Sequence, residues 1–201
     1  MIQRIFLILL AAIIMLTATT AISQACVGRI LYVGAMETIE SRTMAELLVL
    51  LINERTGTNV KIRYYDDNNK LYQAFQSHDE EARIDIIIEN SADAMAYLKK
   101  KRLADLDQEY LEVKKIYEKD LNVIWLKPFG FRNYKGPDNQ SISAPLIRND
   151  VLTNYPLLPR ILTKLSGAID EQTFTEIIGK VKSGDKAKNV VKNFLRTKKF
   201  I

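Results

Sequence analysis

Short apolar runs and longer amphipathic stretches alternate along the first three quarters of the chain. The short runs are rich in Val, Ile, Tyr and Trp, which is typical of strands, and several are apolar on both faces, as in strands buried within a parallel sheet. They predict strands at 28–34, 59–65, 84–88, 122–127 and 142–148.

The stretches between these strands repeat apolar residues every three or four positions, which indicates helices. Helices are expected at 39–56, around 71–75, at 91–98 and at 108–119, and the sequence after residue 148 predicts only helices, at 157–165, 169–181 and 187–195. Strands that alternate with helices favour a sheet covered on both faces. We therefore predict a single three-layer α/β domain with a mixed, mostly parallel sheet of about five strands.

Residues 1–25 are predicted to form a signal peptide. Arg4 precedes an apolar run of 12 residues, Ile5–Leu16, which is shorter than the roughly 20 residues of a membrane-spanning helix. The small residues of Ser23-Gln-Ala25 are typical of a cleavage site, which makes Cys26 the first residue of the mature chain. Two interpretations stay open: Cys26 is lipidated and anchors the protein to the membrane, or plain cleavage gives a soluble periplasmic protein.

The composition is that of an ordinary globular protein, with 47% hydrophobic and 26% charged residues. The net charge of +5 arises largely near the C-terminus, where residues 185–201 include six basic residues and one acidic residue. We interpret this segment as the solvated face of a terminal helix, with an anionic lipid surface or an acidic partner as the alternative. A basic excess confined to the tail does not predict nucleic-acid binding.

Few residues offer catalytic or metal-binding chemistry. His78 is the only histidine and Cys26 the only cysteine. A metal cluster and a His-based triad both need more such side chains at compatible spacings. The sequence therefore predicts a protein that is not an enzyme and holds no metal or cofactor.

Six segments, taken in order, resemble a known family. They are Val33–Ser41, Ile84–Glu89, Val123–Phe131, Ala144–Val151, Tyr155–Pro159 and Leu165–Asp170. Together they resemble the substrate-binding proteins of glycine betaine, choline and proline betaine ABC importers, which have the type II periplasmic binding fold. The resemblance implies a periplasmic or otherwise extracytoplasmic protein that works with an ABC permease and ATPase and binds a quaternary ammonium compound.

One departure concerns the second lobe of that fold. Family members place a second α/β lobe between the segments that correspond to Val123–Phe131 and Ala144–Val151, where this chain has only the connector Arg132–Ser141. We therefore expect residues 26–201 to form a single lobe whose binding surface is one open wall. An exposed cation–π contact contributes only about 0.5–1 kcal/mol, whereas micromolar binding needs about −8 kcal/mol. The expected binding is weak, or depends on a second wall from a homo-oligomer or another partner.

The resemblance and the topology place the candidate ligand-binding residues at the ends of the first and third strands, where open α/β sheets bind ligands. These residues are Glu40, Ser41, Glu89, Asn90 and Ser91, joined by Tyr134 of the connector. Ile39 and Asn90 stand where the family has a Thr and an aromatic residue, so part of the usual pocket is absent. In the alternative interpretation, Ser41 and Asn90 only cap helices, and the chain is a periplasmic protein–protein interaction module that binds no small ligand.

Overall fold

The computed structural model describes residues 29–136 and 139–201. The predicted signal peptide, its cleavage site and Cys26 lie outside the described residues. Within the two described ranges, no helix combines the length and the apolar character that crossing a bilayer requires.

Five strands form one sheet, in the order β2-β1-β3-β5-β4. Their bounds are β1 Leu31–Met36, β2 Val60–Tyr65, β3 Ile86–Asn90, β4 Val123–Trp125 and β5 Ser143–Arg148. β1 pairs in parallel with β2 and β3, while β5 pairs antiparallel with β3 and β4. Four strands therefore run in one direction and β5 runs against them, which confirms the mixed, mostly parallel sheet.

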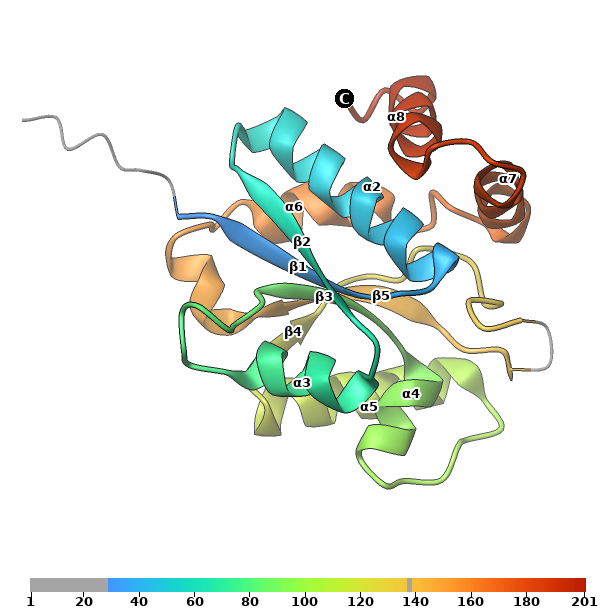
Figure 1. Ribbon diagram of the computed structural model, residues 1–201. Coiled ribbons are helices and arrows are strands. Elements are labelled where there is room, and N and C mark those ends of the chain that lie inside the picture. The colour runs from blue at the N-terminus through green and yellow to red at the C-terminus, as the bar shows by residue number, and fades with distance from the viewer. Residues whose placement is uncertain (1–28, 137–138) are drawn as a thin grey trace, which may run out of the picture.

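Helices cover both faces of this sheet (Figure 1). One face carries α2 (Ile39–Thr56) and α6 (Leu158–Leu162), and the other carries α3 (Asn68–Gln76), α4 (Ser91–Tyr97) and α5 (Leu106–Asp120). The chain ends in α7 (Glu171–Lys182) and α8 (Ala187–Thr197), and short 3₁₀ turns lie at η2 (Asn149–Thr153) and η3 (Thr163–Leu165). The three predicted layers are confirmed, and the helix expected at 157–165 appears as α6 followed by η3.

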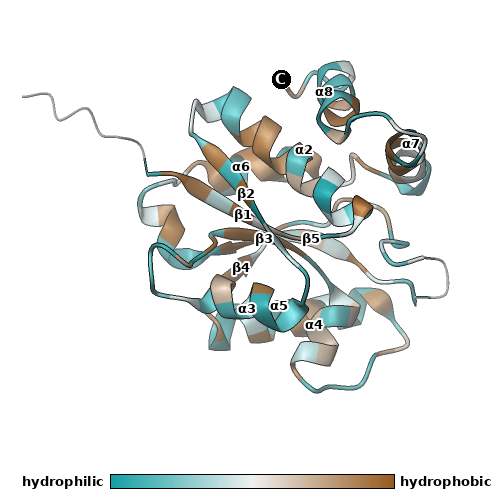
Figure 2. Cartoon of the chain, in the orientation of Figure 1, coloured by the Kyte–Doolittle hydropathy of each residue, from teal (hydrophilic) through white to brown (hydrophobic). Residues whose placement is uncertain are grey.

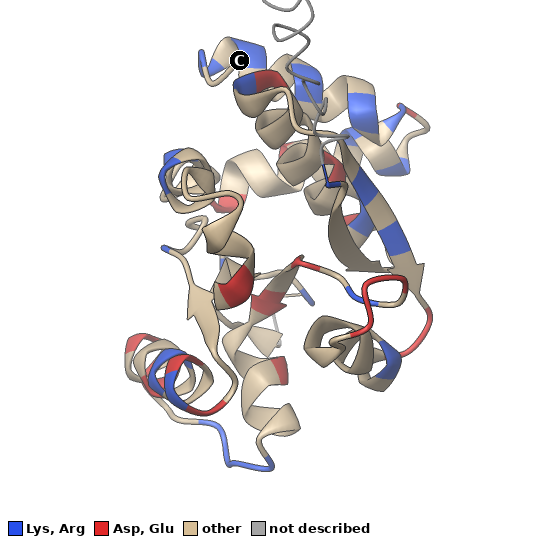
Figure 3. Cartoon of the chain, turned by 90° about the vertical axis from the view of Figure 1, so that its left-hand side faces the viewer, with Lys and Arg blue, Asp and Glu red and all other residues tan. Residues whose placement is uncertain are grey.

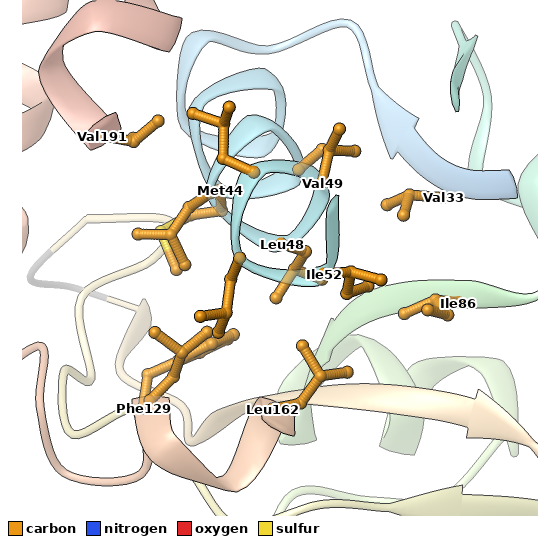
Figure 4. Close-up of a cluster of buried hydrophobic side chains, with 14 of the residues drawn as sticks. Val33, Met44, Leu48, Val49, Ile52, Ile86, Phe129, Leu162 and Val191 are labelled. Carbon is orange, nitrogen blue, oxygen red and sulfur yellow. The ribbon is translucent and has the colours of Figure 1, made fainter. Parts of the chain in front are cut away.

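The α2 helix lies at the centre of the larger hydrophobic core. Ten of its residues are buried, and its last turn ends at Gly57, which adopts the left-handed conformation (φ 69°) that glycine tolerates best. Leu48 and Ile52 fill the space between α2 and the sheet near Ile86, while Val191 of α8 faces the helix from the other side (Figure 4). Apolar residues colour much of α2 in Figure 2, as expected for a helix with neighbours on several sides.

On the opposite face, α3 packs closely against β1 because residue 34 is a glycine. A Cβ at Gly34 would stand 2.1 Å from Ile84 Cδ1 and 2.7 Å from Leu71 Cδ1. Both distances are far below van der Waals contact. The absence of a side chain here sets the spacing between the sheet and α3.

The connector is fixed at both ends by polar contacts. Four consecutive basic residues, Lys99–Arg102, form the loop that follows α4 (Figure 3), and Arg102 donates hydrogen bonds to Asn139 Oδ1 (3.1 Å) and the Gln140 carbonyl (2.7 Å). At the other end, the Arg132 amide donates to Glu171 at the start of α7 (2.9 Å). These bonds hold the connector beside the strand ends and bring the start of α7 with it.

Candidate ligand-binding site

A cavity of about 840 Å³ lies where β1 and β3 end. Its walls come from the start of α2, the end of β3, the start of α4, the connector and one face of α7. The lining includes Thr38, Glu40, Ser41, Asn68, Glu89, Asn90, Asp93, Asn133, Tyr134, Lys135, Glu171, Phe174, Ile178, Gly179 and Lys182. Its position at the C-terminal ends of parallel strands is the usual one for ligands in open α/β sheets.

The structure brings five of the six predicted residues to this cavity: Glu40, Ser41, Glu89, Asn90 and Tyr134. Ser91 is not among the lining residues. Its buried hydroxyl instead donates to Glu109 Oε1 (2.7 Å) and accepts a hydrogen bond from the Ile142 amide (3.2 Å). Ser91 follows the last residue of β3. Its side chain connects α5 with the residue that precedes β5, and it is not part of the cavity lining.

Two of the predicted residues also stabilise helix starts. Asn90 caps α4 through its side-chain oxygen, which accepts from the Asp93 amide (2.9 Å). The cap of α2 is Thr38 and not Ser41: the Ser41 amide donates to Thr38 Oγ1 (3.2 Å), and Ser41 Oγ accepts from the Met36 amide (2.9 Å). The capping interpretation is thus confirmed for Asn90, which also lines the cavity, and wrong for Ser41, whose hydroxyl instead accepts from the last residue of β1.

Glu89 is the most perturbed titratable residue of the cavity. Only 4% of it is exposed, its Oε1 accepts from the Asn90 amide (2.7 Å), and its Oε2 accepts from the Tyr72 hydroxyl. Burial raises the pKa of Glu89 to about 8, with a further upward contribution from the charge of Asp93. Glu89 is therefore mostly neutral at pH 7 and gains its charge as the pH passes 8.

The Tyr72 hydroxyl continues this network away from the cavity. It lies 2.6 Å from the Tyr117 hydroxyl, and both rings are buried between α3, α5 and the sheet. Burial raises the pKa of both phenols further above the ordinary range. Both phenols stay protonated, so Glu89 is the group in this hydrogen-bond network that titrates near neutrality.

The sequence did not identify the second wall of the cavity. The prediction of one open wall is wrong, because α7 and the connector close part of the opposite side with Phe174, Ile178 and Lys135. Two ion pairs cross between the walls: Lys182 of α7 lies 2.8 Å from Glu40 of α2, and Lys135 of the connector pairs with Asp93 of α4. The amphipathic pattern of 169–181 identified a helix, but nothing in that pattern indicated that the helix returns to the strand ends.

The aromatic part of the lining consists of Tyr134 and Phe174. Their rings are tilted by 42° with centroids 6.1 Å apart. Phe174 also stacks on the buried ring of Phe131 at 4.0 Å, so one of its faces is covered. Burial raises the pKa of the Tyr134 hydroxyl above the ordinary range. Two rings in this arrangement do not surround a ligand.

The lining carries more acidic than basic side chains. Glu40, Glu89, Asp93 and Glu171 face Lys135 and Lys182, and each lysine is paired with a carboxylate. Asn133 Oδ1 is buried and accepts no hydrogen bond from the part of the chain that the structure describes. No group of three or more His, Cys, Asp and Glu residues in that part is placed to hold a metal ion. The cavity is therefore suited to a positively charged organic molecule.

Comparisons with known proteins identify a shared fold, and they do so through solved structures. No protein-family model matches the chain, and no curated protein matches it. Among solved structures, the chain is similar to a glycine betaine/carnitine/choline ABC transporter, with a TM-score of 0.75 and 12% identity over 85% of this chain and 99% of that one. It is also similar to apo YehZ from Escherichia coli, with a TM-score of 0.70 and 13% identity over 85% and 99% of the two chains. At this level of identity the likeness establishes a shared fold: the chain is a single α/β domain that resembles a lobe of a periplasmic binding protein.

Proposed function

We propose that the protein is the substrate-binding component of an ABC import system and holds a small organic molecule with a positively charged nitrogen in the cavity at the strand ends. Quaternary ammonium compounds such as glycine betaine and choline are the first candidates, because the sequence resembles proteins that bind them and a solved structure of this fold is a glycine betaine/carnitine/choline ABC transporter. The observation that carries the proposal is the cavity itself, in which Glu40, Asp93 and Glu171 face two lysines that are already paired, while the fourth carboxyl group, that of Glu89, is mostly neutral at pH 7 because burial raises its pKa.

In this proposal, the protein works outside the cytoplasm and catalyses no reaction. Its partners are an ABC permease and ATPase, and Cys26 is the proposed point of attachment to the membrane. Binding by the isolated chain is expected to be weak, since two aromatic rings contribute about 1–4 kcal/mol of cation–π attraction, against the roughly 8 kcal/mol of micromolar binding. A partner that covers the open side of the cavity would exclude water and strengthen these contacts.

Gly179 allows a direct test of the site. It lies on α7, lines the cavity, and has no heavy atom within 4 Å of the position that a Cβ would take. A large side chain can therefore be placed there without a clash at its first carbon. Gly179→Trp is expected to occupy cavity volume, whereas the matched control Gly179→Ala adds one methyl group to open space.

The experiment is calorimetric titration of the full chain and both variants with glycine betaine, choline, proline betaine and the primary amine ethanolamine. The proposal predicts saturable 1:1 binding of at least one compound by the wild type and by Gly179→Ala, and at least tenfold weaker binding by Gly179→Trp. The absence of binding by the wild type, or equal binding by Gly179→Trp, contradicts it.

The alternative of a protein–protein interaction module requires an exposed apolar surface where a second lobe would dock. The exposed large apolar residues within 29–136 and 139–201 are Ile39, Tyr64, Leu103, Leu111 and Leu157. They come from α2, β2, the loop after α4, α5 and the segment before α6. This distribution over five segments gives the alternative no specific support.

A further inference from the structure

The polar part of the cavity offers hydrogen-bond acceptors that a quaternary ammonium ion cannot use. Among the described residues, Glu171 accepts one amide hydrogen bond, from Arg132, through Oε2, and the ion pairs of Glu40 and Asp93 each use a single carboxylate oxygen. A carboxylate has room for about four hydrogen bonds. Binding a ligand without N–H groups would remove these oxygens from water and leave them unpaired, which is unfavourable.

The walls already bind ammonium groups that do carry N–H donors. Lys182 Nζ lies 2.8 Å from Glu40 Oε1, and Lys135 Nζ contacts Asp93 Oδ2. Both lysines and both carboxylates line the cavity. These ion pairs show that the lining satisfies ammonium groups through short N–H···O contacts, each of which uses one oxygen of its carboxylate.

The aromatic part of the cavity offers less to a trimethylammonium group. One face of Phe174 is covered by Phe131, so only its other face and the ring of Tyr134 can contact a cation. Methyl groups on nitrogen interact favourably with several aromatic faces at once. Against these two rings stand Glu171, which is not paired with a lysine in the described part of the chain, and the one oxygen of Glu40 and of Asp93 that its ion pair leaves unused.

From these contacts we infer that the cavity selects cations with N–H donors, namely protonated primary and secondary amines, over their quaternary analogues. This inference rests on the proposed function and specifies its substrate class. Each N–H that is replaced by N–CH₃ removes one charge-assisted hydrogen bond to Glu171, Glu40 or Asp93. The expected loss is about tenfold in affinity for each such bond.

The test is a methylation series at constant charge: ethanolamine, N-methylethanolamine, N,N-dimethylethanolamine and choline, titrated calorimetrically into the full chain at pH 7. All four carry one positive charge and the same hydroxyl group, so only the number of N–H donors and methyl groups changes. The inference predicts that affinity falls at each step, by about tenfold for each hydrogen bond lost. Affinity that stays level or rises with methylation overturns the inference while the proposed function stands, and the absence of binding by all four overturns both.

Glu171→Ala locates the effect, with Glu176→Ala as its matched control. Glu171 lines the cavity, whereas Glu176 is exposed on the same helix and lines the separate groove between α7 and α8. The ratio of ethanolamine to choline affinity is expected to fall about tenfold in Glu171→Ala and to remain unchanged in Glu176→Ala. Because this ratio is measured within one protein, a general loss of stability does not imitate the result, and an unchanged ratio in Glu171→Ala contradicts the assignment.

Discussion

Glu89→Gln is expected to make the protein more stable at high pH. Glu89 is neutral in the fold at pH 7 because burial raises its pKa to about 8 from the ordinary 4.5. A glutamine resembles the neutral acid in shape, and its amide can accept from the Asn90 amide while donating to the Tyr72 hydroxyl. That hydroxyl in turn can donate to Tyr117. The substitution therefore keeps the hydrogen-bond network and removes only the charge.

The magnitude follows from proton linkage. Between pH 4.5 and about 8 the unfolded chain releases the Glu89 proton and the folded chain keeps it, so stability falls as the pH rises through this range. Each pKa unit corresponds to 1.36 kcal/mol, and ionising Glu89 thus lowers the free energy of unfolding by about 4 kcal/mol between pH 5 and pH 9. Glu89→Gln lacks this contribution. It is expected to match the wild type near pH 5 and to exceed it by about 3–4 kcal/mol at pH 9.

The assay is urea unfolding followed by circular dichroism at pH 5, 7 and 9, with Glu80→Gln as control. Glu80 is exposed and pairs with Arg29 at 3.0 Å, so its removal should change stability by less than about 1 kcal/mol at every pH. The reasoning is refuted if the wild type and Glu89→Gln keep a constant difference from pH 5 to pH 9, or if Glu89→Gln is the less stable protein at pH 9.

Three further predictions concern the packing and the site. Gly34→Ala is expected to lower the free energy of unfolding by about 1–3 kcal/mol, because its methyl group would overlap Ile84 and Leu71; urea unfolding that gives wild-type stability contradicts the close packing of α3 on β1. Gly179→Ala is expected to raise stability by about 0.5–1 kcal/mol, because it replaces a helical glycine in open space, and thermal unfolding that shows a loss would be inconsistent with the open position. Choline, whose charge does not titrate, is expected to bind several-fold more tightly at pH 9 than at pH 6.5, because Glu89 ionises in the cavity beside Asp93 and Lys135; calorimetry that shows equal affinities would place choline away from Glu89.

The fold could be predicted from the sequence because each helix and strand has its own periodicity of apolar residues. The buried runs around Val33, Ile86 and Leu146 are apolar on both faces, and α2 is apolar on most sides, so these patterns identify a covered sheet without any knowledge of the contacts. The direction of β5 was less accessible, since an apolar run is the same when read in either direction.

The site was accessible only in part. The topology rule placed Glu40 and Glu89 correctly, because strand ends converge whatever the side chains are. Lys182 and Phe174 were missed because their approach to the cavity depends on how α7 packs after a connector that has no periodic pattern. The sequence also could not predict that Asn90 lines the cavity and Ser91 does not, since neighbouring residues at the end of β3 point in different directions and Ser91 faces Glu109.

The central claim is that the cavity between the strand ends and α7 is where a small organic cation binds. The most direct test is to titrate the isotopically labelled chain with ethanolamine and map the changes in backbone amide chemical shifts. The account predicts saturable changes concentrated at 38–41, 89–93, 133–135 and 171–182. Changes centred on the groove between α7 and α8, or no saturable change, would contradict it.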